Sequence, residues 1–153
     1  MSIRTAPEVR KSPLGVIDLN QFSFSERIGY ENSPDITVPI ALYNDVSFSV
    51  PIAAKLDCGS TLCVFQRKFG EMLGLDVESG ILQWIGTATG SFPAYGHDVT
   101  LTTCGLEWQA VVYFAESQAF HLNVVGRIGF LDHLRIALID HDQEFYLSHY
   151  DDV

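Results

Sequence analysis

A regular alternation of apolar with small or polar residues over 46–56 is the feature that most constrains the fold. A period of two held over these eleven residues predicts a β-strand with one buried face. The apolar run at 36–42 and a turn at 43–45 make a hairpin with it. Pro39 and Pro51 cannot donate to a sheet ladder, so we expect them at edge or bulged positions. The chain is therefore expected to be a β protein.

Two further hairpins and a terminal strand pair extend this prediction. Apolar segments at 81–85 and 92–95 flank a glycine-containing loop at 86–91, which predicts a hairpin with a flexible tip. Trp84 and Tyr95 near the tip suit a covering or binding element, although a plain surface hairpin is the alternative. The other strands are expected at 98–103 and 106–114, joined at Cys104-Gly105, and at 134–139 and 144–148.

One short helix is predicted between the first two hairpins. Phe65, Phe69, Met72 and Leu73 fall at positions i, i+4, i+7 and i+8, the pattern of an amphipathic helix that ends at Gly74. Gly70 within it costs about 1 kcal/mol relative to alanine, so tertiary packing must hold the helix. We expect its apolar stripe to be core.

Length and composition indicate one globular domain. The 153 residues are 47% hydrophobic, which is ample for a core. A net charge of −10 argues against nucleic acids or anionic membranes as partners, because both favour clustered Lys and Arg. No stretch approaches the roughly 18 apolar residues of a membrane span. The polar start, residues 1–13, lacks the apolar region of a secretory signal, and three cysteines are an odd number, so a cytoplasmic location with reduced thiols is expected.

Residues 1–35 differ from the rest of the chain. They mix prolines and charges with few apolar residues, and we interpret them as an N-terminal extension to a domain at 36–153. The alternating apolar residues near Leu14 and Phe24 would then lie against the core or a partner subunit. A pro-segment or self-cleavage region is the other possibility.

Asp57 stands between two apolar runs, 52–56 and 62–65, so its carboxylate is predicted to be carried toward the interior. An isolated buried carboxylate is costly unless it is hydrogen-bonded, paired or protonated. Gly59 permits a sharp turn, and Ser60 and Thr61 supply hydroxyls that could bond to the carboxylate. This is the local chemistry of an acid/base residue, but Asp-x-Gly is also an ordinary turn sequence.

A second motif gives Asp57 a context. Leu56-Asp57-Cys58-Gly59-Ser60 resembles the active-site turn of the retropepsin-like aspartic peptidases, and Val124-Val125-Gly126-Arg127 resembles their apolar-apolar-Gly-Arg segment. The stretches 72–75 and 126–135 look like the bacterial branch of that family. The resemblance covers about residues 36–148.

The resemblance implies an all-β fold, a closed barrel with a β-hairpin flap and one or two short helices, one of them C-terminal. It places the flap at 84–95, with Trp84, Ile85, Gly86, Thr87, Ala88, Thr89 and Gly90 against the substrate. It also implies a homodimer in which each subunit contributes Asp57, because one chain holds half of a two-aspartate site. The implied activity is endopeptidase cleavage of polypeptides by a water held between the two carboxylates, with no cofactor.

Four positions depart from the family pattern. Cys58 replaces the Thr or Ser whose hydroxyl braces the two active-site loops across the two-fold axis, so activity or dimerisation could be weak or redox-sensitive; alternatively Cys58 packs as a small apolar residue. Thr61 and Leu62 replace acids, so Arg127 must find another partner. Ser60 replaces an alanine, and its hydroxyl is expected to donate to Asp57 and favour the ionised form.

The residue spacing also bears on other classes of function. No two of the five histidines stand at i, i+4, and Cys58 and Cys63 lack a second pair, which argues against zinc. Nucleophilic catalysis by Cys58 with a distant histidine stays open. The main alternative is a non-catalytic module of the same fold that dimerises or binds peptides.

Overall fold

A computed structural model describes residues 21–30, 33–45 and 51–152 of the chain. The strands are β1 (Glu26–Gly29), β2 (Thr37–Tyr43), β3 (Ile52–Leu56), β4 (Val64–Phe65), β5 (Ile81–Thr87), β6 (Gly90–Thr103), β7 (Leu106–Ala115), β8 (Val124–Val125), β9 (Leu134–Ile139) and β10 (Glu144–His149). The α-helix of this part of the chain is α1 (Arg67–Met72), and the 3-10 turns are η1 (Val77–Ser79), η2 (Leu131–His133) and η3 (Asp140–Asp142).

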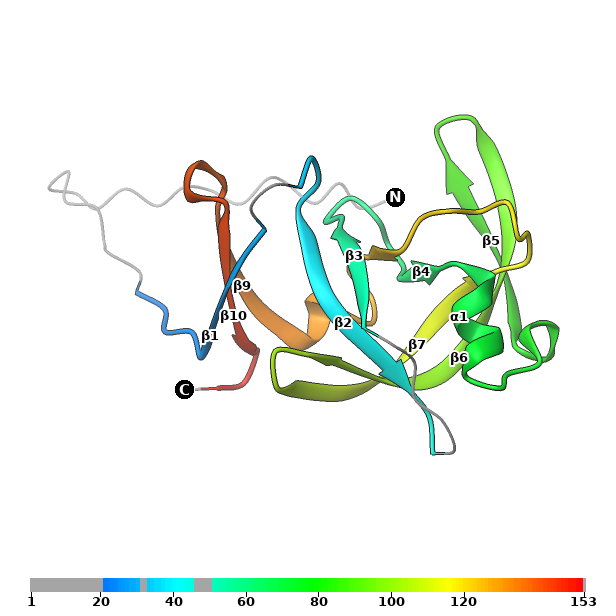
Figure 1. Ribbon diagram of the computed structural model, residues 1–153, viewed down its shortest axis with the longest axis horizontal. Coiled ribbons are helices and arrows are strands. Elements are labelled where there is room, and N and C mark those ends of the chain that lie inside the picture. Colours follow the sequence, from blue (N-terminus) through cyan, green and yellow to red (C-terminus); the bar gives the residue numbers. More distant parts are fainter. Residues whose placement is uncertain (1–20, 31–32, 46–50, 153) are drawn as a thin grey trace, which may run out of the picture.

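Six strands close into a barrel. Their order is β2-β3-β8-β4-β7-β6, and the circle closes because β2 pairs with β3 through Thr37–Ile40 and with β6 through Ala41–Tyr43. The β5–β6 hairpin projects from one end of the barrel, and a sheet of β1, β10 and β9 lies at the other end (Figure 1). The predicted all-β class is confirmed. Closure removes the sheet edges that a flat sheet would expose.

The side chains that form the core come from alternate positions of the strands, as the period of two predicted. Along β7, buried residues alternate with exposed or half-exposed ones as far as Phe114, and β2 shows the same pattern. The largest fully buried side chains are Phe65, Phe114, Phe130 and Phe145. Pro39 lies in the half of β2 that has a paired strand on one side only, and Pro51 precedes the first residue of β3. Both prolines therefore occupy edge positions, where a missing N–H is tolerated.

The predicted extension reaches the core at its C-terminal end. β1 pairs antiparallel with β10, and Tyr30, just after β1, is buried against Phe145 with ring centroids 6.2 Å apart. The Tyr30 hydroxyl donates to Asp140 at 2.5 Å. Residues 1–20 lie outside the described residues, so the predicted role of that part stays a prediction.

The helix prediction needs two corrections. Phe65 belongs to β4 rather than to the helix, which begins at Arg67, and Met72 is 48% exposed instead of core. The helix is only six residues long, so its buried face is narrow and is filled by Phe69 and Gly70. It ends as predicted, with Gly74 at φ 75°, a conformation that glycine adopts without strain.

The hairpin predictions are corrected in detail. The loop expected at 86–91 is a tight turn at Ala88 and Thr89, because β5 continues to Thr87 and β6 begins at Gly90. The segments predicted at 92–95 and 98–103 are one continuous strand, β6. The turn at Cys104-Gly105 and the strands β9 and β10 are confirmed.

The C-terminal helix implied by the family resemblance is reduced to the 3-10 turn η2. Residues 46–50, the first half of the predicted alternating strand, lie outside the described residues; the second half is β3. Among the residues that the structure describes, no helix is long and apolar enough to cross a membrane.

Gly70 gives a test of how α1 is packed. Helix propensity predicts that Gly70→Ala stabilises the protein by about 1 kcal/mol. A β-carbon there would lie 2.9 Å from Cγ of Phe114, a fully buried ring, and 3.2 Å from Val77. We therefore expect Gly70→Ala to lower the free energy of unfolding by about 1–3 kcal/mol, measured by urea denaturation. Lys68→Ala, at an exposed position of the same helix, serves as control. A gain in stability for Gly70→Ala would contradict this packing.

Candidate active site

Asp57 follows the last residue of β3, and the structure brings it beside the second motif. β3 runs parallel to β8, with Leu56 opposite Val125, and the Asp57 amide donates to the Val125 carbonyl at 3.0 Å. The two motifs, about seventy residues apart in sequence, are therefore neighbours in one sheet.

A tight turn follows Asp57. The Ser60 amide donates to the Asp57 carbonyl at 3.1 Å, and the Gly59 amide donates to Oδ1 of Asp57 at 2.9 Å. The carboxylate thus accepts a backbone hydrogen bond, which fixes its orientation. Asp57 is half-buried, so the expectation that it is carried toward the interior is met only in part.

The prediction that Ser60 donates to Asp57 is wrong. The Ser60 hydroxyl donates instead to the Leu62 carbonyl at 2.8 Å, two residues along the chain. A serine in a turn commonly bonds to nearby backbone in this way. Ser60 therefore shapes the turn, and its hydroxyl is used by the Leu62 carbonyl instead of the Asp57 carboxylate.

Gly126 packs directly under the active-site turn. The amides that follow it continue the contact, because Arg127 donates to the Ser60 carbonyl and Ile128 to the Thr61 carbonyl, each at 2.9 Å. A β-carbon at Gly126 would lie 2.5 Å from the Leu62 carbonyl oxygen and 2.6 Å from that of Ser60. Only glycine allows this approach of the two backbones.

Cys63 is a supporting residue that the sequence reasoning missed. The Gly126 amide donates to Sγ of Cys63 at 3.4 Å, and that sulfur donates to the Ile128 carbonyl at 3.4 Å. Burial raises the pKa of the Cys63 thiol to about 11, so it stays protonated and can donate. The apolar run at 62–65, which contains Cys63, was the sequence signal that could have placed this side chain inside.

A cavity of about 290 Å³ opens beside Asp57. Its floor is formed by the turn and the barrel, and its roof by the β5–β6 hairpin. The lining residues are Asp57, Gly59, Ser60, Val64, Ile85, Gly86, Thr87, Phe92, Phe120, Leu122 and Val124. A carboxylate in a cavity whose other side chains are mostly apolar suits a ligand with both a polar backbone and apolar side chains.

A second cavity, of about 330 Å³, lies between the same hairpin and the turn. It is lined by Gly59, Ser60, Thr61, Leu62, Gln83, Trp84, Ile85 and Gly86. Residues 84–87 of the predicted flap therefore face the two cavities. Ala88, Thr89 and Gly90 form the tip and line neither of these cavities.

Phe92, Phe120 and Leu122 were not predicted as site residues. Phe92 lies within the predicted flap, but Phe120 and Leu122 belong to the segment 116–123 between β7 and β8, which carries no motif. Phe120 packs on Phe92 with ring centroids 4.8 Å apart, so this segment forms a side wall of the first cavity.

Cys58 and Arg127 lie on the face next to the cavity rather than in it. Both are exposed, and they line a surface depression with Ile128, Leu131 and Asp132. Cys58 is therefore not packed inside its own chain. Among the described residues, Arg127 makes no ion pair, so the different partner expected for it does not occur within this part of the chain.

Comparison with known proteins supports the fold. No family model and no curated protein matches the chain. A retropepsin-like aspartic protease from Rickettsia conorii matches in structure with a TM-score of 0.55 and 18% identity, over 80% of this chain and 98% of that one. The EIAV protease complexed with the inhibitor HBY-793 matches with a TM-score of 0.49 and 19% identity, over 65% and 88%.

The chain therefore has the retropepsin-like fold, which the sequence resemblance implied. At such low identity the match establishes the architecture and leaves the chemistry to be argued from the site.

A substitution at Gly126 tests whether the stability of the fold depends on the close approach of the Gly126 backbone to the turn. We expect Gly126→Ala to lower the free energy of unfolding by about 3 kcal/mol, because two carbonyl oxygens that belong to the turn would have to move. Gly86→Ala is the control, since a β-carbon there meets nothing within 4 Å. Thermal unfolding followed by circular dichroism measures both. Equal melting temperatures for Gly126→Ala and wild type would contradict the close packing.

Proposed function

We propose that the protein is an aspartic endopeptidase that works as a homodimer, with one Asp57 from each subunit. The observation that carries this proposal is the position of Asp57: it ends a barrel strand, is oriented by the Gly59 amide, and opens into a cavity under a β-hairpin. The retropepsin-like fold supports it, because the same architecture occurs in an aspartic protease from Rickettsia conorii.

The dimer is needed because each chain has one Asp-x-Gly turn of this kind. The face that carries Cys58, Arg127 and the 52% exposed Ile128 adjoins the turn and is open in the single chain. A two-fold axis through this face would bring two Asp57 carboxylates together. Cys58 would then lie at the axis, where its thiol could pack against the partner or be oxidised.

The proposed mechanism follows from two carboxylates about 3 Å apart. They cannot both ionise easily, so the pair keeps one proton. The ionised member takes a proton from a water between them, and the water oxygen attacks the peptide carbonyl carbon. The protonated member donates to the developing oxyanion. The tetrahedral intermediate then collapses: the proton taken from the water passes to the leaving amine nitrogen, and the C–N bond breaks. The Gly59 amide holds each Asp57 in place throughout, since its bond runs to the side-chain oxygen.

The proposed substrate is an extended polypeptide. Two cavities flank the turn under one hairpin, which suits successive side chains of a strand-like segment. The first cavity is lined by Ile85, Phe92, Phe120 and Leu122 among others, so it favours an apolar side chain next to the cleaved bond.

Asp57→Asn tests the mechanism, because it keeps the shape of the side chain but removes the titrating group. We expect wild type to cleave an unfolded protein within about pH 4–7, where carboxylate pairs change protonation, and Asp57→Asn to show no cleavage above a blank. Asp98→Asn, which removes an exposed carboxylate on β6, should cleave like wild type. Cleavage by Asp57→Asn would contradict the mechanism, and no cleavage by any of the three would favour the non-catalytic module.

A further inference from the structure

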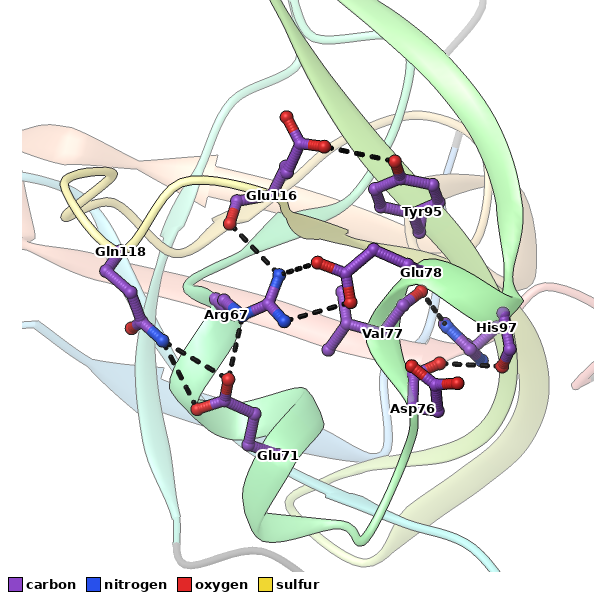
Figure 2. A network of polar contacts seen from close by, with 10 residues as sticks. Arg67, Glu71, Asp76, Val77, Glu78, Tyr95, His97, Glu116 and Gln118 are labelled. Atoms are coloured by element: carbon purple, nitrogen blue, oxygen red, sulfur yellow. Dashed lines mark hydrogen bonds and ion pairs between the residues drawn. The ribbon is translucent and has the colours of Figure 1, made fainter.

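A cluster of charged and polar groups behind the first cavity has no part in the proposed mechanism. At its centre is Arg67, the first residue of α1, whose side chain is only 17% exposed. Its guanidinium binds Glu71 at 2.7 Å and both carboxylate oxygens of Glu78, at 2.5 and 2.9 Å (Figure 2). The fork of an arginine suits such a two-oxygen contact, which a lysine cannot make.

The cluster also binds the segment 116–123, which is the side wall of the cavity. Arg67 donates to the Glu116 carbonyl at 3.1 Å, and the Gln118 side-chain amide donates to the two Glu71 oxygens at 3.2 and 3.4 Å. The Glu116 carboxylate accepts from the Tyr95 hydroxyl at 3.1 Å (Figure 2). Because Tyr95 belongs to β6, this links the wall to the strand that carries the flap.

The wall also has backbone anchors at its two ends and a local turn between them. The Glu116 amide donates to the Pro93 carbonyl at 3.0 Å, and at the far end Asn123 accepts from the Lys55 amide at 2.8 Å with its carbonyl and from the Gln66 amide at 3.1 Å with its side chain. In the turn, the Phe120 amide donates to the Ser117 carbonyl at 3.3 Å. Between these anchors, Phe120 rests on Phe92 and, with Leu122, faces the cavity. The contacts at 116–118 fix the start of the wall, and the positions of Phe120 and Leu122 depend on this end together with the anchor at Asn123.

We infer that the Arg67 cluster positions the cavity wall, and that Arg67 and Gln118 thereby set the preference for a large apolar side chain beside the cleaved bond. This inference rests on the proposed function. Neither residue touches the cavity, so both act through Phe120 and Leu122. The hydrogen bonds from Arg67 lower the pKa of Glu78, so this ion pair persists as the pH falls toward the acid range and is lost only below the ordinary pKa of the carboxyl.

The test uses Gln118, because it is exposed and its replacement does not endanger the core. Gln118→Glu places a second carboxylate beside Glu71, and the repulsion between the two should push the wall away from α1. Gln118→Lys places a cation beside Glu71 and should hold the wall in its wild-type position. The readout is the ratio of kcat/KM for two peptides that differ only in Phe or Ala before the cleaved bond, together with hydrogen exchange at 116–122.

We expect Gln118→Glu to reduce the Phe-over-Ala ratio by about tenfold and to speed exchange at 116–122, with the pH profile of cleavage unchanged. Gln118→Lys should restore both values to those of wild type. A wild-type ratio and wild-type exchange in Gln118→Glu would overturn the inference. If no variant, wild type included, cleaves either peptide, the proposed function fails, and faster exchange in Gln118→Glu alone still supports the positioning of the wall.

Discussion

The backbone contact between Gly126 and the turn after Asp57 is the constraint on which the rest of the site depends. Gly126 lies so close to the Ser60 and Leu62 carbonyls that no side chain fits between them, and Arg127 and Ile128 donate to the same turn. These contacts join the backbone after Gly126 to the backbone of the turn, so the orientation of Asp57 does not depend on flexible side chains. Inside the barrel, the Cys63 thiol accepts from the Gly126 amide and donates to the Ile128 carbonyl, which adds two further bonds to the same backbone segment.

Strand pairing in the barrel brings Gly126 to the turn, and the first cavity lies beside that turn. Parallel pairing of β3 with β8 needs a long crossover, which the chain provides with α1 and the strands β4 to β7. The crossover also delivers both walls of the cavity: the β5–β6 hairpin as roof and the segment 116–123 as side. The Arg67 cluster joins these parts where α1, η1 and β6 meet.

The sequence revealed most of the strands and the two motifs, because alternation with a period of two and the Asp and Gly turns are local signals. The closed barrel was implied only by the resemblance of the two motifs to the retropepsin-like family. The sequence did not reveal that Ser60 bonds to Leu62, that Phe65 leaves the helix, or that Phe120 reaches the cavity. Those outcomes depend on competition between partners that meet only in the folded chain. The hairpin loop is shorter than the predicted 86–91, because Gly86 lies inside β5 and Gly90 begins β6. The roles of Asp57 and of the flap residues stay predictions.

Mixing active and inactive subunits tests most directly whether two Asp57 residues form one site. Wild type and Asp57→Asn are unfolded together in equal amounts, refolded, and compared with the same amount of wild type refolded alone. Random pairing leaves a quarter of the dimers with two intact carboxylates, so the activity should fall to about half of that control. Activity equal to the control would show that each chain works alone and would contradict a site shared between two subunits.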